Sequence, residues 1–209
     1  KIAMALSGIF LIVFLTQHFL INITSVFSED IFNMLSHFMG NNPLVQFVLQ
    51  PVLIAGVLFH FVMGFVLEWQ NRKARPVKYA MYKGSKNSMF VSRNMIISGI
   101  VILSFLVLHF YDFWVPEMDY KYIKSLPEDP NRYFEELIHK FENPVRVGLY
   151  CLSFIFLALH LVHGLSSSTQ SLGTNNKYAR TIEKISYAFG IGIPLGFCFI
   201  ALYHFFIHF

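Results

Sequence analysis

Two stretches of the chain repeat one pattern: SGIFLIVFLTQH at residues 7–18 and SGIVILSFLVLH at residues 98–109. Each begins with a serine and a glycine, continues through mostly apolar residues, and reaches a histidine ten residues after the glycine. Two other segments share a second pattern, in which a histidine precedes a glycine by four residues, beginning at His60 and at His160. The chain therefore contains a duplicated unit of two segments, and each segment carries one histidine.

The segments that carry these histidines are long and uncharged. A helix needs roughly 20 apolar residues to cross about 30 Å of hydrocarbon, so five such runs predict five transmembrane helices. A composition with 55% hydrophobic and only 13% charged residues excludes an ordinary soluble domain. We expect one all-α membrane domain over residues 1–209, in which four of the five helices form a bundle around the histidines. The uncharged runs are residues 2–28, 44–67, 94–111, 147–176 and 185–209.

The charges between the runs predict the orientation of the chain. Seven Lys or Arg and no acidic residue lie from Arg72 to Arg93, and the positive-inside rule places such a segment in the cytoplasm. The segment after the first run carries Glu29 and Asp30 without a basic residue, and residues 116–143 carry seven acidic against four basic residues. Both of these segments are expected outside, so the N-terminus is cytoplasmic and the C-terminus external.

The direction of each run sets the depth of its histidine. His18 and His109 lie past the middle of outward-running helices, which places them in the outer half of the membrane. His60 and His160 lie past the middle of inward-running helices, in a layer on the order of 10 Å away at 1.5 Å of rise per residue. His163 lies one turn after His160, but only His160 precedes a glycine by four residues as His60 does. The sequence therefore predicts an outer and an inner histidine pair.

An imidazole without a partner is costly inside a membrane, so each of these histidines needs a metal or a hydrogen bond. Two imidazoles saturate the axial positions of a haem iron, which suits electron transfer and leaves no position for oxygen. Matched depths and the internal repeat favour two haem b groups over four unrelated polar contacts. No CxxCH motif is present, so the haems would be bound without covalent attachment. Cys151 and Cys198 lie in predicted spans and are expected to be small buried side chains.

Four further residues of the repeat are expected to serve the haems. Ser7 and Ser98 lie eleven residues before their histidines, which is almost three helical turns. They therefore share a face with those histidines but lie about 16 Å nearer the cytoplasm, beside the inner haem. Gly8 and Gly99 remove side chains where a flat macrocycle or a neighbouring helix must approach closely.

Together these features resemble the dihaem cytochrome b membrane subunit of bacterial succinate dehydrogenases and fumarate reductases, in its single-polypeptide, five-helix form. The resemblance covers essentially the whole chain. It rests on the opening KIAMALSGIF, on one histidine in each of the first four helices, on Arg75-Pro76 in the basic segment, and on His160 followed by Gly164 and Gly173.

The resemblance implies that His18 and His109 ligate the iron of the distal, outer haem, and His60 and His160 that of the proximal, inner haem. It also implies a flavoprotein and an iron–sulfur subunit on the cytoplasmic face of a bacterial inner membrane. Electrons would pass between them and a quinone, with menaquinone expected, and no nucleic acid would be involved. Succinate chemistry would belong to the partners, because this chain has no flavin-binding fingerprint or cysteine cluster.

The position of the quinone is less constrained by the sequence. Some related subunits carry a glutamate on the outer segment before the second helix, where this chain has only His37 as a titratable side chain. Glu29 and Asp30 are the nearest acidic residues, so these three are the quinone-site candidates. Two other interpretations stay open: the haem b anchor of another respiratory oxidoreductase, and a haem-free transporter or assembly protein whose histidines line a proton path.

Overall fold

The computed structural model describes residues 1–74, 95–173 and 178–208, and these residues form helices and connecting segments without a strand. Five of the helical segments are long and apolar enough to cross a membrane, so the prediction of five spans is confirmed. The chain thus has the architecture of a multi-pass membrane protein. The spans are Ile2–Val26, Val45–Lys73, Met95–Ile123, Pro144–Ser171 and Ala179–His208.

The first three spans are α-helices that carry short 3₁₀ or π stretches at the end nearer α2, and the last two spans are single α-helices. The first two consist of α1 (Ile2–Ile23) with a 3₁₀ turn (Thr24–Val26), and of a π stretch (Val45–Leu49) with α3 (Gln50–Lys73). The third contains α6 (Met95–His109), a π stretch (Phe110–Trp114), α7 (Val115–Met118) and a second π stretch (Asp119–Ile123). The last two are α9 (Pro144–Ser171) and α10 (Ala179–His208), and α2 (Glu29–Asn41) and α8 (Arg132–Phe141) are shorter helices between spans.

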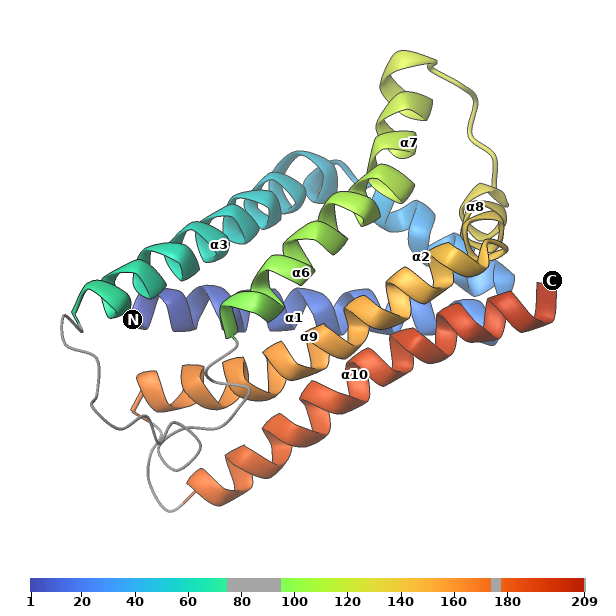
Figure 1. Ribbon diagram of the computed structural model, residues 1–209. Coiled ribbons are helices and arrows are strands. Elements are labelled where there is room, and N and C mark those ends of the chain that lie inside the picture. Colours follow the sequence, from blue (N-terminus) through green and yellow to red (C-terminus); the bar gives the residue numbers. More distant parts are fainter. Residues whose placement is uncertain (75–94, 174–177, 209) are drawn as a thin grey trace.

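The spans alternate in direction, as a multi-pass topology requires. Figure 1 shows the N-terminus at the same end of the bundle as the C-terminal end of α3, and α2, α8 and the C-terminus at the opposite end. Most of the basic segment, including Arg75-Pro76, lies outside the described residues. The cytoplasmic position of the N-terminus therefore stays a prediction.

The segment after the first span contains a 13-residue helix, α2, which the charge pattern did not predict. The side chain of Ser28 caps this helix by accepting a hydrogen bond from the backbone N–H of Ile31, at 3.3 Å. Glu29 and Asp30 lie in its first turn, where the helix dipole favours acidic side chains. The sequence signal was thus present, as a serine followed by two acidic residues.

The third span is longer than its uncharged run. The run ends at residue 111, but the helical rod continues to Ile123, and Figure 1 shows α7 projecting beyond the neighbouring helices. Charged residues do not end the rod because they are paired: Lys121 lies 2.5 Å from a carboxylate oxygen of Glu117, one turn earlier. Pro116 lies at the start of α7, directly after the π stretch Phe110–Trp114.

The second short helix, α8, confirms a helix that the apolar spacing of residues 131–140 predicts. Leu137 and Phe141 are buried on its inner face, where they join the hydrophobic core. The side chain of His139 is 79% exposed, as expected for a solvated residue. The helix therefore covers the outer end of the bundle.

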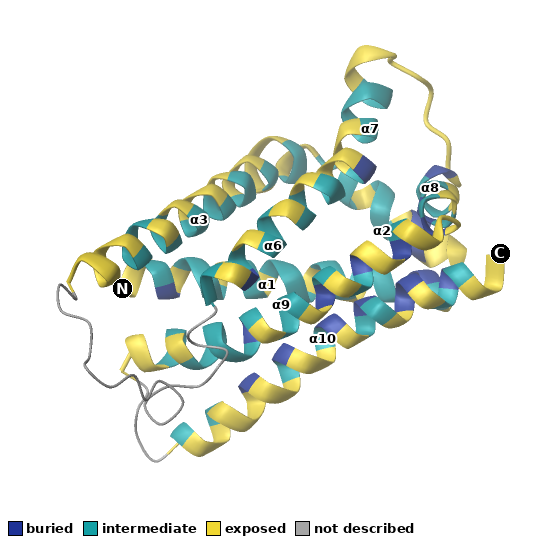
Figure 2. Cartoon of the chain, viewed as in Figure 1, coloured by how far each residue is buried: buried dark blue, intermediate teal, exposed yellow. Residues whose placement is uncertain are grey.

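Burial is concentrated in the last two spans. Figure 2 shows buried residues along α9 and α10 and near α8, whereas α3 contains none. Cys198 on α10 lies across this interface from Cys151 on α9, with its Sγ 3.8 Å from the Cys151 carbonyl oxygen. Both thiols are free and half-buried, so they are more exposed than expected and, unexpectedly, adjacent.

Candidate functional site

Four helices bring the four repeat histidines together in two pairs. His18 on α1 faces His109 on α6, with ring centroids 5.8 Å apart and ring planes at 85°. His60 on α3 faces His160 on α9, with centroids 6.3 Å apart and planes at 69°. Each pair takes one histidine from each repeated unit, which is the pairing that the repeat predicts.

Ser7 holds the inner histidine His60. Its Oγ lies 3.0 Å from Nδ1 of His60, and its hydroxyl donates to the backbone carbonyl of Met4, at 2.8 Å. A serine hydroxyl has a single proton, so the bond between the two side chains must be donated by the imidazole Nδ1–H. Nε2 of His60 then carries the lone pair, which is the form of histidine that binds a metal.

The second unit reproduces this arrangement. The Oγ of Ser98 lies 3.2 Å from Nδ1 of His160, and its hydroxyl donates to the carbonyl of Met95, at 2.9 Å. The same proton count leaves the lone pair on Nε2 of His160. The two inner histidines are therefore fixed in the same tautomer by equivalent serines, a role for Ser7 and Ser98 that the sequence did not predict.

The repeat glycines lie beside these histidines. A Cβ added to Gly8 would lie 3.6 Å from Cε1 of His60, and one added to Gly99 would lie 4.0 Å from Cε1 of His160. These are ordinary van der Waals separations, so an alanine would fit at either position. A larger side chain would meet the edge of the imidazole. Both glycines thus belong to the inner site.

A third element of the repeat escaped the sequence analysis. A Cβ added to Gly64 would lie 3.7 Å from Cε of Met4, and one added to Gly164 would lie 3.6 Å from Cε of Met95. The same two methionines accept the serine hydroxyl protons. The signal was available, because a methionine precedes the serine by three residues in both units.

The outer pair is surrounded mainly by aromatic rings. Phe14 stacks on His18 with centroids 5.5 Å apart, and Phe105 stacks on His109 at 5.6 Å. Nδ2 of Asn22 lies 3.4 Å from Nδ1 of His18 and donates to the His18 carbonyl at 2.8 Å. Nδ1 of His109 is buried and has no hydrogen-bond partner among the described residues. In the ranges that the structure describes, no serine bonds to His18 or His109 as Ser7 and Ser98 bond to the inner histidines.

A buried carboxylate next to the outer pair was also missed. Asp112 lies in the π stretch after α6, and its side chain is fully buried. Its Oδ2 accepts a hydrogen bond from the hydroxyl of Tyr150 at 2.9 Å and lies 3.1 Å from Nε of Arg146. The signal was a lone acidic residue among aromatic residues at the end of an apolar run, because ionisable residues at such positions are usually functional.

The separations of the histidine pairs fit haem iron. A metal–imidazole nitrogen bond is roughly 2 Å long and a ring centroid lies about 1 Å behind its nitrogen, so two axial imidazoles have centroids about 6 Å apart. Within the described ranges, no three His, Cys, Asp or Glu side chains converge on a metal site. Two imidazoles are too few for a structural zinc ion, but they are all that a six-coordinate haem requires from the protein.

The packing around the histidines is also compatible with a flat cofactor. The buried residues of the first three spanning α-helices are few: α3 has none, α1 has only Ala5 and α6 has only Ser98. By contrast, α10 buries seven residues, largely against α9 (Figure 2). Few residues of the helices that carry three of the four histidines are therefore fully buried by this chain, although Phe10 of α1 packs closely against Gly56 of α3.

The last span is attached to the outer end of the first. His204 on α10 is only 1% exposed, and its Nε2 lies 2.9 Å from Oγ of Ser25. The Ser25 hydroxyl donates to the carbonyl of Asn22 at 2.7 Å, so the imidazole Nε2–H donates to Ser25. The ring of His208 stacks on His204 at 5.6 Å. The sequence left the role of these histidines open, and the structure makes His204 a tether between helices.

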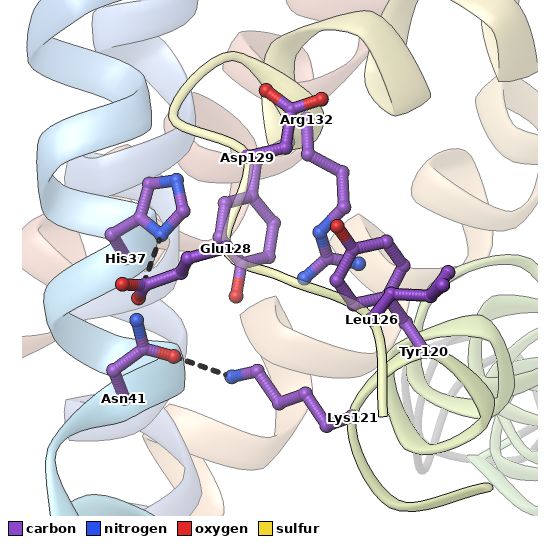
Figure 3. Close-up of a pocket in the computed structure, with 9 residues that line it drawn as sticks. His37, Asn41, Tyr120, Lys121, Leu126, Glu128, Asp129 and Arg132 are labelled. Atoms are coloured by element: carbon purple, nitrogen blue, oxygen red, sulfur yellow. Dashed lines mark hydrogen bonds and ion pairs between the residues drawn. The ribbon is translucent and has the colours of Figure 1, made fainter. Parts of the chain in front are cut away.

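The quinone candidates do not come together. His37 on α2 lines a cavity of about 240 Å³ between α2, the end of the third span and α8 (Figure 3). Its Nδ1 lies 3.7 Å from Oε1 of Glu128, and its Nε2 donates to the Pro130 carbonyl at 3.2 Å. Glu29 and Asp30 are exposed in the first turn of α2 and do not line this cavity. Its lining combines charged side chains with apolar surface from Leu126 and the rings of Tyr120 and Tyr133.

A network around Glu117 forms one wall of this region. Glu117 accepts hydrogen bonds from Arg132 and from the hydroxyl of Tyr133, and also pairs with Lys121. Burial, reinforced by the nearby charge of Glu117, raises the pKa of Tyr133, so its phenol stays protonated and donates. The network therefore fixes α8 to the end of the third span.

Comparison with protein families, with curated proteins and with solved structures finds no match to this chain. The function is therefore argued from the geometry of the histidine pairs and from the resemblance in the sequence.

Proposed function

We propose that this chain is the membrane anchor and electron-transfer subunit of a bacterial succinate:quinone oxidoreductase, with two haem b groups between a cytoplasmic iron–sulfur subunit and menaquinone. The observation that supports this proposal best is the repeated inner arrangement. Two serines fix His60 and His160 in the tautomer that leaves Nε2 free for a metal, and the rings are separated by the distance that one iron would span.

In this proposal each pair has one task. His18 and His109 hold the outer haem iron, and His60 and His160 hold the inner one. With two imidazoles holding each haem, no position would be left on the metal for oxygen or substrate. Haem iron supplies reversible one-electron transfer when it is bound. Phe14 and the other outer aromatic rings keep water from the outer pair.

The partners are assigned from charge and resemblance. Lys73 and Arg72, at the C-terminal end of α3, are exposed and lie at the same end of the bundle as the N-terminus. They begin the basic segment, which the positive-inside rule places in the cytoplasm. We infer that the iron–sulfur subunit and the flavoprotein dock at this end, where the inner histidine pair is the nearer one.

Purification of the intact complex in mild detergent tests the proposal. A pyridine haemochrome assay should give about two protohaems per chain, and a flavoprotein and an iron–sulfur subunit with succinate dehydrogenase activity should accompany it. A chain without haem would favour the transporter or assembly interpretation. Two haems with other soluble subunits would instead identify the anchor of a different oxidoreductase.

A further inference from the structure

The four paired histidines differ in what holds Nδ1. Two have a serine oxygen as acceptor, whereas Nδ1 of His18 lies 3.4 Å from the amide nitrogen of Asn22, which is a donor. His109 alone among these four has a buried Nδ1 without a partner in the described chain. This difference matters because a histidine that binds iron through Nε2 carries its proton on Nδ1 and almost always donates it to an acceptor.

Asp112 has a carboxylate oxygen of the kind that accepts a hydrogen bond from an imidazole N–H. Its Oδ2 accepts a hydrogen bond from Tyr150 and forms an ion pair with Arg146. Its Oδ1 is buried and has no partner among the described residues. A buried carboxylate oxygen left unpaired is costly, so a donor is expected. The structure describes four buried, unpaired side-chain atoms, and only Nδ1 of His109 and Oδ1 of Asp112 lie within one turn of each other on one helix.

The surroundings connect the two groups. Asp112 follows His109 by three residues and lies in the middle of the π stretch, a type of helix irregularity that is frequent at functional sites. Tyr150 contacts both, since its hydroxyl donates to Asp112 and its ring centroid lies 6.2 Å from that of His109. Arg146 balances the carboxylate charge, so Asp112 can stay ionised beside an apolar bundle.

We propose that Asp112 is a positioning residue for the outer haem, whose Oδ1 accepts the Nδ1–H of His109 directly or through one water. This inference rests on the proposed function, because it requires iron at Nε2 of His109. Tyr150 and Arg146 hold Oδ2 and so orient Oδ1. A carboxylate acceptor raises the basicity of the imidazole more than a neutral serine does and favours ferric iron. Asp112 therefore lowers the reduction potential at the outer pair relative to the inner pair.

The test is a redox titration of the purified holo-complex carrying Asp112→Asn. The outer haem, identified by its loss in a His109→Ala variant, should become easier to reduce. Loss of a hydrogen-bond partner of a metal ligand typically has an effect of about 10–100-fold. A tenfold change in the ratio of ferric to ferrous haem corresponds to about 59 mV for a one-electron couple. The inner haem should keep its potential. Low-temperature electron paramagnetic resonance should show a changed signal for the outer haem alone.

Tyr150→Phe is the comparison variant, because it removes one of the two partners of Oδ2 but keeps the carboxylate and its Oδ1, so its effect on the outer haem should be smaller than that of Asp112→Asn. A purely structural role predicts equal shifts in both variants, and that result, or an unchanged outer haem in Asp112→Asn, would overturn the inference. If Asp112→Asn fails to retain the outer haem, Asp112→Glu should restore it, and failure to do so would also count against the proposal. A wild-type chain without haem would instead refute the proposed function.

Discussion

Gly190 of α10 lies directly against the backbone of Val162 on α9: a Cβ at position 190 would be 2.8 Å from the Val162 nitrogen. Real side chains essentially never approach a backbone atom so closely, and a backbone atom cannot rotate away as a side chain can. The absence of a side chain at Gly190 therefore sets the distance between the two most heavily buried spans. Because His160 is also on α9, this contact helps to position the helix that carries one of the two inner histidines.

We predict that Gly190→Ala destabilises the protein by about 1–3 kcal/mol, as overpacking of a close contact does. Gly192→Ala is the matched control on the same helix, because no atom lies within 4 Å of a Cβ there. Thermal unfolding in detergent should show a lower midpoint for the first variant alone. Equal midpoints for both would contradict the close contact between α9 and α10.

We predict that Ser7→Ala and Ser98→Ala each weaken the inner haem, because each leaves one imidazole Nδ1–H without its acceptor. Loss of such a partner typically costs about 10–100-fold in metal affinity or activity. Haem release into excess apomyoglobin measures the effect. Ser104→Ala is the control: this serine is exposed on α6, and within the described part of the chain it bonds to the Ile100 carbonyl alone, at 3.0 Å. If Ser7→Ala and Ser98→Ala both release haem at the wild-type rate, the serines do not hold the histidine ligands in place.

We predict that His160 rather than His163 is the fourth ligand. His160 pairs with His60 and bonds to Ser98, whereas His163 has neither contact among the described residues. His160→Ala should remove the inner haem from the optical spectrum, and His163→Ala should retain both haems. The opposite pattern would mean that the repeat assigns the wrong residue.

The repeat made much of this site predictable, because residues eleven apart on a helix must share a face, and so Ser7 could be placed relative to His18. The partners of Asp112 were not predictable in the same way. Arg146 and Tyr150 come from a helix more than 30 residues further along, and no periodic pattern links them to position 112. Likewise, hydropathy ended the third span too early, since it counts charges but not the pairing that neutralises them.

We predict that a quinone reacts near the outer pair, within reach of residues 22–37, because a haem at that depth is useful only if electrons enter or leave there. Electron transfer across the full membrane would respond to the potential by about 2.3 kcal/mol per charge per 100 mV. Succinate–quinone activity should therefore change when an uncoupler is added to energised vesicles. Substitutions of Glu29, Asp30 and His37 locate the outer site, and since the structure separates His37 from the other two, their effects should differ. Activity indifferent to the uncoupler and to all three substitutions would place the quinone at the cytoplasmic side.

The duplicated unit also has a consequence for assembly. Each histidine pair combines one residue from α1 or α3 with one from α6 or α9, so neither half of the chain contains a complete pair. A bound cofactor would join the halves as a cross-link does, and any stabilisation it provides would vanish if the halves separated. Such a chain, cut in the segment between α3 and α6, should stay associated for as long as both cofactors are retained.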